Sequence, residues 1–380
     1  MTVNVTRDAI NVREKLAELD KPTGIAGEAM LRAETPQEQF NLIGAGRRNL
    51  IINGAMQVAQ RGTSASVSDN SNEGYSTLDR WATQFNSAIG GSITYSQSSD
   101  APSGFANSAK IQCASTHTPA SYGDYLSLRT TIEAQDLQQL AYGTSDAKEI
   151  TLSWYMKVET YSGPISVGFQ TKDGTSEYFV KSVTPTSSWT RYSITVPAST
   201  TATINNDNGA GLQVEFVLSG DTANTNFDRA TDSTAWETTR YQYVSDVGNI
   251  LSNTSNAIYI TGVQLELGKV ATPFEHRSYG EELALCQRYY QYGQTRGGIP
   301  MYDSYGFYPP THFNTSMRAN PTVSVTSVEF RPTGSSNETP AYIASQNQFT
   351  DGFGVIVQAS SSYQDQNGYG TYSWTADAEL

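Results

Sequence analysis

The residues able to do chemistry are scattered along this chain rather than grouped. Three histidines, His117, His276 and His312, lie far apart, and none has a metal ligand or a base at a characteristic spacing. Hydrolysis of a glycosidic bond needs two carboxylates about 5–10 Å apart. The acidic residues that qualify only loosely are better explained as surface charges or turn caps: Asp79, Glu133, Asp136, Glu215 and Glu266. We therefore predict no catalytic residue, no cofactor and no enzyme activity.

Metal binding stays an open question at the level of sequence. The run NTNFDRATD, residues 224–232, has oxygen ligands of the kind that calcium prefers, but it lacks the ordered spacing of a calcium loop. The glycines of LIGAGRRN follow an expected helix rather than a strand, so they are interpreted as a helix end and not as a phosphate-binding loop. The sequence therefore leaves open whether calcium is bound.

Binding of a sugar is the chemistry that the aromatic residues favour. A pyranose ring stacks on an exposed aromatic face and is oriented by amide and carboxylate hydrogen bonds. Six aromatic residues in polar, loop-like or tip-like segments are the candidates for glycan binding: Trp236, Tyr241, Tyr243, Tyr302, Tyr305 and Tyr308. The tip-like segment, which also holds Phe307, suits a protein contact equally well. Trp81, Trp154 and Trp189 follow strand-like alternation and are predicted to lie in the core.

The elements that would carry these residues are mainly strands. Apolar and polar residues alternate in runs separated by turns such as KDGT and NNDNG, which predicts an antiparallel β-sandwich of the jelly-roll type. A long strand in AIYITGVQLELG changes phase near Gly262, where a β-bulge fits. The expected strands of this part are 149–158, 165–170, 178–183, 190–196 and 212–218. Further strands are expected in PTVSVTSVEF, GFGVIVQAS and GTYSWTADAEL, near the C-terminus.

Helices are predicted at the N-terminus and between two β-domains. Thr35, Pro36, Glu38 and Gly44 form a capping box with a glycine stop, and Ser278 with Glu281 forms another at the start of a helix over about 279–292. The N-terminal helices are too short to be stable alone, so they should become ordered against other subunits or a partner. The residues expected to attach the chain there are Ile10, Leu16, Leu19, Phe40, Leu42, Arg47 and Arg48.

The expected organisation is therefore mainly β with a short helical leader. It comprises a leader at 1–48, a jelly-roll domain at 49–276, a linking helix at 277–292 and a small β-domain at 293–380. Charge separates these parts: residues 1–50 have seven basic and seven acidic residues, whereas the remainder has 17 basic and 30 acidic residues. An acidic body argues against nucleic acid as a partner.

Targeting signals and disulfides are not expected. No stretch approaches the ~18 apolar residues of a membrane span, and the first residues lack the apolar region of a signal peptide. Synthesis is therefore expected in a host cytoplasm, without membrane insertion. The two cysteines, Cys113 and Cys286, lie far apart and are interpreted as free thiols packed as small apolar groups.

Several segments together resemble tail-fibre-like virion proteins of tailed phages, especially phages of marine bacteria. They are GIAGEAMLRAETPQEQFNLIGAGRRNLIINGAMQVAQRG, TLDRW, YITGVQLELGKVATPFEHRSYGEELALCQRYYQ and YSWTADAEL. The resemblance implies a jelly-roll domain similar to carbohydrate-binding modules, a homotrimer, and an external appendage of the virion. It assigns no catalytic residue. Trp81, Gln264, Glu266 and Phe274 match its pattern and are interpreted as markers of the fold.

The functional hypothesis is a structural subunit of a virion, attached to other virion proteins through residues 1–48, whose β-domains recognise a host-surface glycan. Two alternatives remain open. One is a purely architectural virion protein, such as a head decoration or a tail-assembly element without a ligand. The other is a polysaccharide depolymerase, which the absence of long repetitive β-helical segments makes the weaker choice.

Overall fold

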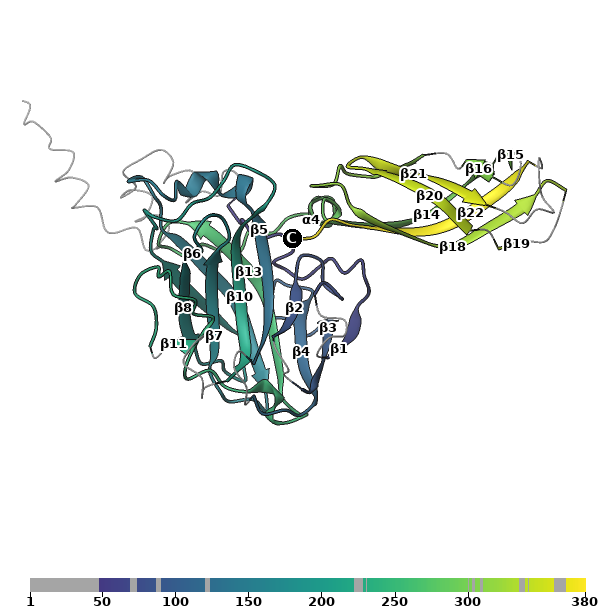
Figure 1. Cartoon of the computed structure of the whole chain (residues 1–380). Coiled ribbons are helices and arrows are strands. Elements are labelled where there is room, and N and C mark those ends of the chain that lie inside the picture. The colour runs from purple at the N-terminus through teal and green to yellow at the C-terminus, as the bar shows by residue number, and fades with distance from the viewer. Residues whose placement is uncertain are drawn as a thin grey trace, which may run out of the picture. The chain divides into compact units, whose positions relative to one another are not determined.

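The structure is a computed structural model of the whole chain (Figure 1). It describes residues 48–68, 74–86, 90–119, 124–221, 228–229, 231–299, 301–302, 305–307, 310–334, 339–340, 342–358 and 367–380. The chain divides into two compact units, Met1–Arg48 and Asn49–Leu380. The leader helices and all the attachment residues predicted there except Arg48 lie outside the described residues, and Arg48 itself is half-buried. The account below concerns Asn49–Leu380.

The fold is mainly β, as predicted, and its largest part is a sandwich of two antiparallel sheets (Figure 1). A six-stranded sheet has the order β1-β3-β4-β13-β6-β9, and a five-stranded sheet has the order β2-β5-β10-β7-β8. The strands of the first sheet are β1 (Ser64–Ser68), β3 (Ser92–Ser98), β4 (Ser108–Ser115), β13 (Ala257–Leu267), β6 (Ile150–Glu159) and β9 (Thr190–Val196). Those of the second are β2 (Ala82–Asn86), β5 (Tyr125–Glu133), β10 (Ala210–Gly220), β7 (Ile165–Thr171) and β8 (Tyr178–Val183).

Alternating side chains explain why these strands close on one core. On β10, Leu212, Val214 and Phe216 are fully buried between the sheets. Trp81 and Trp154 are also fully buried, and each contacts Phe216 with ring centroids 6.3 and 5.4 Å apart. The predicted core positions of both tryptophans are therefore confirmed. At about 25 cal/mol per Å² of buried apolar surface, such aromatic side chains are the largest single contributors to a core.

The bulge predicted near Gly262 is confirmed. The pairing of β13 with β6 shifts register between Thr261 and Gln264, and Gly262 has a φ of 61°. A Cβ at this position would approach the ring of Phe105 to 2.7 Å and that of Tyr155 to 2.9 Å. Both the backbone conformation and the close rings therefore require glycine here.

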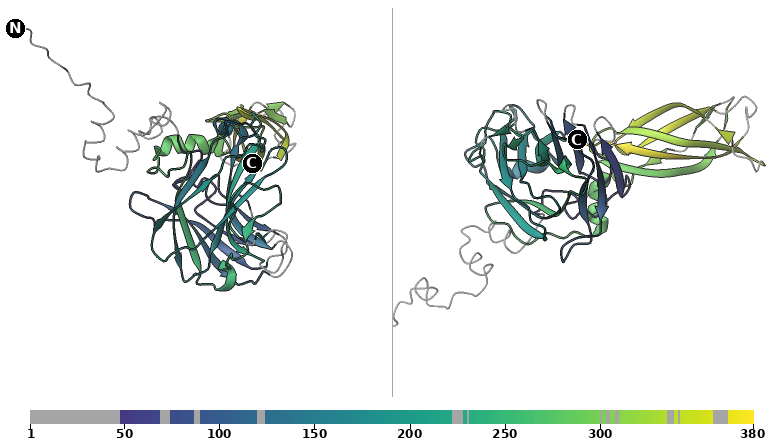
Figure 2. Two further views of the ribbon diagram at one scale, coloured as in Figure 1. Left: turned by 90° about the vertical axis from the view of Figure 1, so that its left-hand side faces the viewer. Right: turned by 90° about the horizontal axis from the view of Figure 1, so that it is seen from below.

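The C-terminal strands form two further antiparallel sheets, drawn as two layers in Figure 2. One has the order β14-β22-β18-β19, and its core side carries Phe330, Tyr372 and Trp374, which pack with Phe353 of the other. Its strands are β14 (Tyr290–Ile299), β22 (Gly368–Asp377), β18 (Thr322–Pro332) and β19 (Thr339–Pro340). The second sheet contains β15 (Met301–Tyr302), β16 (Tyr305–Phe307), β17 (Thr311–His312), β20 (Tyr342–Phe349) and β21 (Gly352–Gln358).

Short elements complete the described part of the unit. A small parallel pair joins β11 (Asp228–Arg229) to β12 (Tyr243–Val244), and two 3₁₀ helices are η1 (Ala134–Leu140) and η2 (Ile250–Ser252). The helix α4 (Tyr279–Gln287) begins with the predicted capping box, in which Ser278 and Glu281 bond reciprocally. It ends before the expected residue 292, because Tyr290 already belongs to β14, where pairing with Asp377 of β22 replaces helical bonds.

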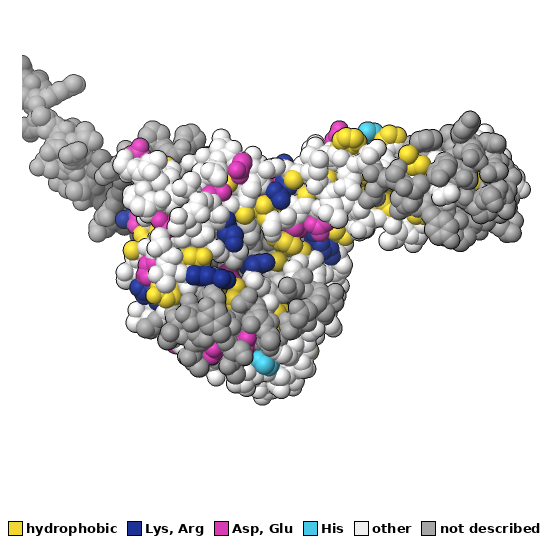
Figure 3. Space-filling model, viewed as in Figure 1, with side chains coloured by type: hydrophobic (Ala, Val, Ile, Leu, Met, Phe, Trp, Pro, Cys, Tyr) yellow, Lys and Arg dark blue, Asp and Glu magenta, His cyan; other side chains and the backbone are white. Residues whose placement is uncertain are grey.

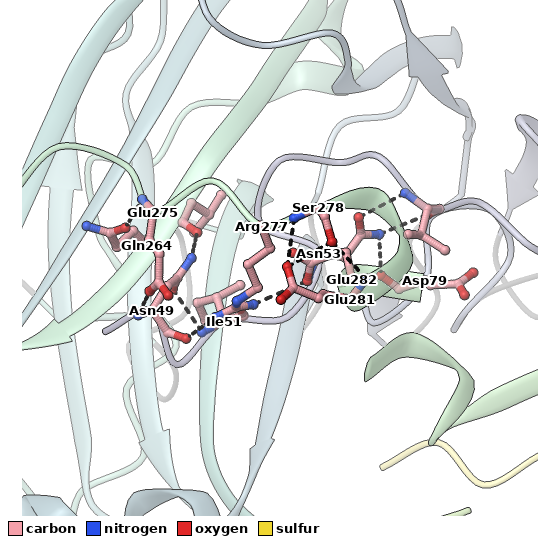
Figure 4. A network of polar contacts seen from close by, with 12 residues as sticks. Asn49, Ile51, Asn53, Asp79, Gln264, Glu275, Arg277, Ser278, Glu281 and Glu282 are labelled. Carbon is pink, nitrogen blue, oxygen red and sulfur yellow. Dashed lines mark hydrogen bonds and ion pairs between the residues drawn. The ribbon is translucent and has the colours of Figure 1, made fainter. Parts of the chain in front are cut away.

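A buried polar network joins the start of the sandwich to α4 (Figure 4). Asn49 Oδ1 accepts from the backbone N–H groups of Ile51 (2.9 Å) and Leu265 (3.1 Å), and its amide donates to Val263 O (3.1 Å). The N–H of Asn49 donates to Glu275 Oε2 at 2.6 Å, so the segment that enters the sandwich is fixed to both β13 and the segment before α4. Arg277 then donates to the carbonyls of residues 49 and 51 and to Glu282.

Three of the four sequence segments that carry the resemblance therefore meet in or beside this network. Gln264 donates to Glu266 (2.9 Å) and accepts from the N–H of Glu275 (2.8 Å), while the Trp81 indole donates to Asn53 O (3.1 Å). Phe274 packs edge-on against Phe105, with centroids 5.0 Å apart. These contacts are internal to the fold, in agreement with the interpretation of Trp81, Gln264, Glu266 and Phe274 as fold markers.

Candidate functional site

The outer face of the five-stranded sheet carries a row of polar side chains across four strands. Register places Glu215 of β10 opposite Arg129 of β5 and Gly168 of β7, and Gln213 opposite Gln170. Gln170 in turn faces Tyr178 of β8. Because residues two apart on a strand share a face, Gln213 and Glu215 point away from the core that Leu212, Val214 and Phe216 fill. Lys and Arg side chains gather over β5, β10 and β7 in Figure 3.

Hydrogen bonds connect the members of this row. Lys172 Nζ lies 3.4 Å from Gln213 Oε1 and 3.3 Å from Gln170 Oε1, and Gln170 donates to the Tyr178 hydroxyl (3.1 Å). Gln213 Nε2 donates to Glu215 Oε2 at 3.3 Å. The row is therefore a connected set of donors and acceptors rather than a collection of isolated surface groups. We call these five residues with Arg129 the polar row.

Glu215 is the electrostatic centre of the polar row. Its side chain is buried, and burial raises its pKa above the ordinary value, while the nearby Ser127 hydroxyl and the charge of Arg129 oppose that rise. With its amide oriented to satisfy both neighbours, Gln242 donates to Glu215 Oε2 (3.0 Å) and accepts from Arg240 Nε (3.2 Å). A buried carboxylate held among amides and cations is well placed to accept hydrogen bonds from a polar ligand.

A pocket lies on this face, but it is too narrow to admit a water molecule. Tyr241 and Gln242 line it from above the sheet, and Tyr178, Gln213 and Glu215 line it from the strands. Pockets that enclose a drug-sized ligand measure roughly 300 Å³ or more. A ligand of this face would therefore lie across the outer surface of these side chains rather than be enclosed.

The structure places the sandwich's three predicted glycan-binding aromatics in three different environments. Tyr241 is half-buried and lines the pocket. Trp236 packs on the main core, and its indole donates to Pro197 O at 2.7 Å. Tyr243 is fully buried, with its hydroxyl donating to Asp221 O (2.9 Å), so its ring has no free face for a sugar. Of the three, Tyr241 alone joins the polar row.

The other predicted aromatics lie on the small hairpin of β15 and β16. Tyr302 and Tyr305 face each other across its backbone pairing. Their side chains, that of Phe307 and the whole of Tyr308 lie outside the described part of the structure. The prediction that this segment contacts a glycan or a protein therefore stays a prediction.

The predicted core position of Trp189 is wrong. Trp189 precedes β9 by one residue and is half-buried, with its indole donating to Asp100 Oδ1 (3.0 Å) and its ring 6.3 Å from that of Tyr259. Ile194 and Val196 of β9 face the core, and Trp189 lies in the opposite phase of the alternation. Its sequence neighbours, Ser188 and Thr190, are both polar, so they do not indicate which face of the strand Trp189 belongs to.

Four of the five carboxylates interpreted as surface charges or turn caps are buried, so surface charge is the wrong description of those four. Asp79, Glu133, Glu215 and Glu266 are buried and Asp136 is half-buried. Arg288 donates twice to Glu133, at 2.9 and 2.8 Å, and Glu266 accepts from Thr272. Each has a structural partner, because an unpaired buried charge is too costly to persist.

The structure also places three further features of the sequence: the two cysteines, His276 and the calcium-like run. Cys113 and Cys286 are free and buried, as predicted. His276 packs against the rings of Phe105 and Phe274, with centroids 5.1 and 4.9 Å away. Asp232, from the calcium-like run, pairs with Lys181 at 3.5 Å.

No group of three or more His, Cys, Asp or Glu side chains within the described ranges is arranged to hold a metal ion. Among the same residues, no helix has the length and apolar character needed to cross a membrane.

From the sequence, Glu215 was considered only as a weak catalytic candidate, and the other members of the polar row were not predicted. The available signal was the outward phase of β5 and β10, where Arg129 and Gln213 alternate with buried Leu128 and Leu212. Such alternation shows which residues share a face of one strand. It does not show that β5 and β7 both pair with β10, which is what brings the row together.

Comparisons with known proteins give similarity in structure only. No protein-family model and no curated protein matches the chain. A carbohydrate-binding module, CBM4, is similar with 17% identity over 57% of this chain and 98% of its own, at a TM-score of 0.31. The family 11 carbohydrate-binding module of a cellulosomal cellulase of Clostridium thermocellum has 13% identity, coverage of 55% and 98%, and a TM-score of 0.28.

A third similar structure is the N-terminal cellulose-binding domain of Cellulomonas fimi β-1,4-glucanase C. It has 10% identity over 56% of this chain and all of its own, at a TM-score of 0.29. TM-scores near 0.3 at such low identity do not identify a ligand. The functional proposal therefore rests on the residues of the chain itself.

Proposed function

We propose that the chain is a non-enzymatic saccharide-binding protein and that the polar row, with Tyr241, forms its binding face. The observation that carries this proposal is the convergence of a carboxylate, amides, cations and phenol rings on the outer face of one sheet. Adjacent hydroxyls of a sugar act as both donors and acceptors. Glu215, Gln213 and Gln242 provide the matching acceptors and donors.

The same geometry disfavours hydrolysis at this face. A glycosidase requires a pair of carboxylates flanking the scissile bond. Glu215 is the acidic side chain that lines the pocket, and its other pocket neighbours are amides, phenols and apolar groups. A single buried carboxylate surrounded by amides binds and orients a ligand, whereas it lacks the second group needed to activate water or form a covalent intermediate.

Binding is tested by screening the full-length chain on a glycan array and titrating the best saccharide calorimetrically. Glu215→Gln removes the charge but keeps the volume, and we expect it to weaken binding about 10–100-fold through loss of charge-assisted hydrogen bonds. Tyr241→Ala should weaken binding through loss of the ring. Release of new reducing ends from any bound polysaccharide would instead indicate a depolymerase.

Matched controls separate a site effect from a general one. Glu149→Gln changes a carboxylate paired with Lys269 on the six-stranded sheet's side, and Tyr279→Ala removes an exposed tyrosine of α4. Both should bind like the wild type. A blank array, or equal affinity in wild type and Glu215→Gln, would overturn the proposal and favour a purely architectural role.

We also propose that the chain is a tail-fibre-type subunit of a tailed-phage virion, attached through residues 1–48 and assembled as a homotrimer. The support is the resemblance of the quoted segments and the division of the chain at Arg48 into two compact units. Labelling purified particles with an antibody against this chain tests its location. Analytical ultracentrifugation showing a stable monomer, together with unlabelled particles, would reject this assignment.

A further inference from the structure

The C-terminal sheet that contains β14, β22 and β18 also has a polar outer face, like the polar row of the sandwich. Packing of the core does not account for the residues exposed there. Alternation on β14 exposes Tyr292, Gln294 and Arg296. In register, Arg296 lies opposite Thr371 of β22, and Thr371 lies opposite Glu329 of β18. The next row along the strands places Tyr369 between Arg331 and Gly298. This outer face lies opposite the core side that holds Phe330, Tyr372 and Trp374.

A hollow of about 460 Å³ lies on this face. That volume falls within the roughly 300–1,000 Å³ range of ligand sites in proteins. Its lining is polar apart from one phenol ring and the glycines, and consists of Gln294, Arg296, Gly297, Glu329, Arg331, Tyr369, Gly370 and Thr371. We call it the β22 hollow.

Glycine at position 298 leaves one side of Tyr369 uncovered. Gly298 is the β14 partner of Tyr369, and a Cβ built there would meet no atom within 4 Å. The Tyr369 side chain is accordingly 66% exposed, the highest exposure among the large apolar side chains described. A tyrosine held in a strand beside a glycine presents an open ring for stacking by a planar or cyclic ligand.

The charge of the hollow contrasts with its surroundings. Residues 289–380 contain three basic residues, all arginine, and seven acidic ones. One of the three, Arg318, donates to the carbonyls of Ala378, Asn208 and Glu379. The other two, Arg296 and Arg331, both line the β22 hollow. Arg296 also donates from Nε to Gln294 Oε1 (3.2 Å), within the same lining. Two of the three cations of this acidic segment are therefore concentrated at one place.

We infer that the β22 hollow binds an acidic saccharide, whose ring stacks on Tyr369 and whose carboxylate or sulfate lies between Arg296 and Arg331. The planar guanidinium group presents parallel N–H donors that match either anion. Gln294, Thr371 and Glu329 are placed to bond sugar hydroxyls. Glu329 also disfavours a polyphosphate chain, because a continuous run of phosphates would meet its charge. This inference extends the proposed saccharide binding to a second face.

The test uses the full-length chain and four probes: galacturonate oligosaccharides, sulfated dextran oligosaccharides, neutral dextran oligosaccharides and inorganic sulfate. We expect one of the two acidic saccharides to bind, neutral dextran to bind at least tenfold more weakly, and affinity to fall as salt rises. The first two probes distinguish a carboxylate from a sulfate. Inorganic sulfate competing as strongly as the saccharide would overturn the inference, since the site would then bind an anion alone.

Variants locate the binding. Arg296→Gln with Arg331→Gln should reduce affinity about a hundredfold, Tyr369→Ala about tenfold, and Gly298→Phe should block the hollow without removing a charge. Lys269→Gln removes an exposed charge elsewhere and should have no effect. Glu215→Gln should leave this binding unchanged, so failure of the polar row and failure of the β22 hollow are distinguishable. Wild-type affinity in the double arginine variant, or no binding of either acidic probe, would refute the inference.

Discussion

The guanidinium carbon of Arg80 lies 3.5 Å from the centroid of the Tyr289 ring. Arg80 belongs to the TLDRW segment and is fully buried, and Tyr289 lies between α4 and β14. The same guanidinium forms an ion pair with Glu379 and donates to Thr131 O. One cation therefore joins the sandwich, the segment after α4 and the last residues of the chain.

Replacing Glu379 by glutamine should destabilise residues 49–380. The change leaves Arg80 buried without its anionic partner, which costs about 3–5 kcal/mol for a broken buried pair. It also removes the 3.3 Å contact of Glu379 with Arg61. Urea unfolding followed by tryptophan fluorescence measures the loss. Glu149→Gln, which breaks an exposed pair with Lys269, should cost under ~1 kcal/mol; equal losses in both variants would contradict the role assigned to Glu379.

Stability should fall as pH rises from about 4 to about 6 because of Asp79. Burial raises the pKa of this carboxyl to about 6, against hydrogen bonds from Gln60 and the charge of Arg61 that lower it. At pH values between the two pKa values, Asp79 is protonated in the native state but ionised in the unfolded state. Raising the pH through this range therefore lowers the free energy of unfolding, by at most about 3 kcal/mol.

The Asp79→Asn variant isolates this effect. Asparagine cannot ionise, so the difference in unfolding free energy between variant and wild type should grow in favour of the variant from pH 4 to pH 7. Denaturant unfolding at both pH values measures the difference. A pH-independent difference would show that Asp79 does not titrate in this range.

Asn49→Ala should cost several kcal/mol. Its side chain bonds two backbone N–H groups and the carbonyl of Val263 (Figure 4), and each buried group left unpaired costs about 1–3 kcal/mol. Thermal unfolding by circular dichroism measures the decrease in melting temperature. Asn205→Ala is the matched control, because Asn205 is exposed and bonds Asp173 at the surface; it should melt close to the wild type.

Gly262→Ala should destabilise more than Gly268→Ala. Both glycines have positive φ, 61° and 98°, so both substitutions strain the backbone. A Cβ at Gly262 also collides with Phe105 and Tyr155, whereas one at Gly268 meets nothing within 4 Å. We expect the difference in unfolding free energy to be about 1–3 kcal/mol. Equal losses would mean that the rings of Phe105 and Tyr155 move aside freely.

Deletion of residues 1–47 should leave the β-rich unit folded. That unit, Asn49–Leu380, is compact by itself. Far-ultraviolet circular dichroism and the melting temperature of the truncated chain should match those of the full chain. If residues 1–48 attach the chain to a virion, the truncated chain should also be missing from purified particles; its presence there would place the attachment elsewhere.

Local patterns in the sequence predicted most of the fold. Strand alternation located β6, β7, β8, β9, β10 and β13 nearly to the residue, and Ser278 with Glu281 located the start of α4. The end of α4 was misplaced because its last residues are also compatible with β14, and only pairing with β22 decides between the two states.

The candidate site was much less predictable. Arg129, Gln170 and Glu215 come from three strands that are distant in sequence, and the register of β10 with its two neighbours brings them together. Register depends on how whole sheets pack, which a single sequence does not display. Tyr243 illustrates the same limit, since its polar neighbours suggested exposure while packing against Tyr125 and Val217 buries it.

The network of Asn49, Arg277 and Glu282 also has a mechanical consequence. It ties the residue at which the chain enters the sandwich directly to the helix through which it leaves (Figure 4). Tension applied between Asn49 and Tyr289 would therefore act on these short polar contacts and, through the bonds of Asn49 to Val263 and Leu265, on β13.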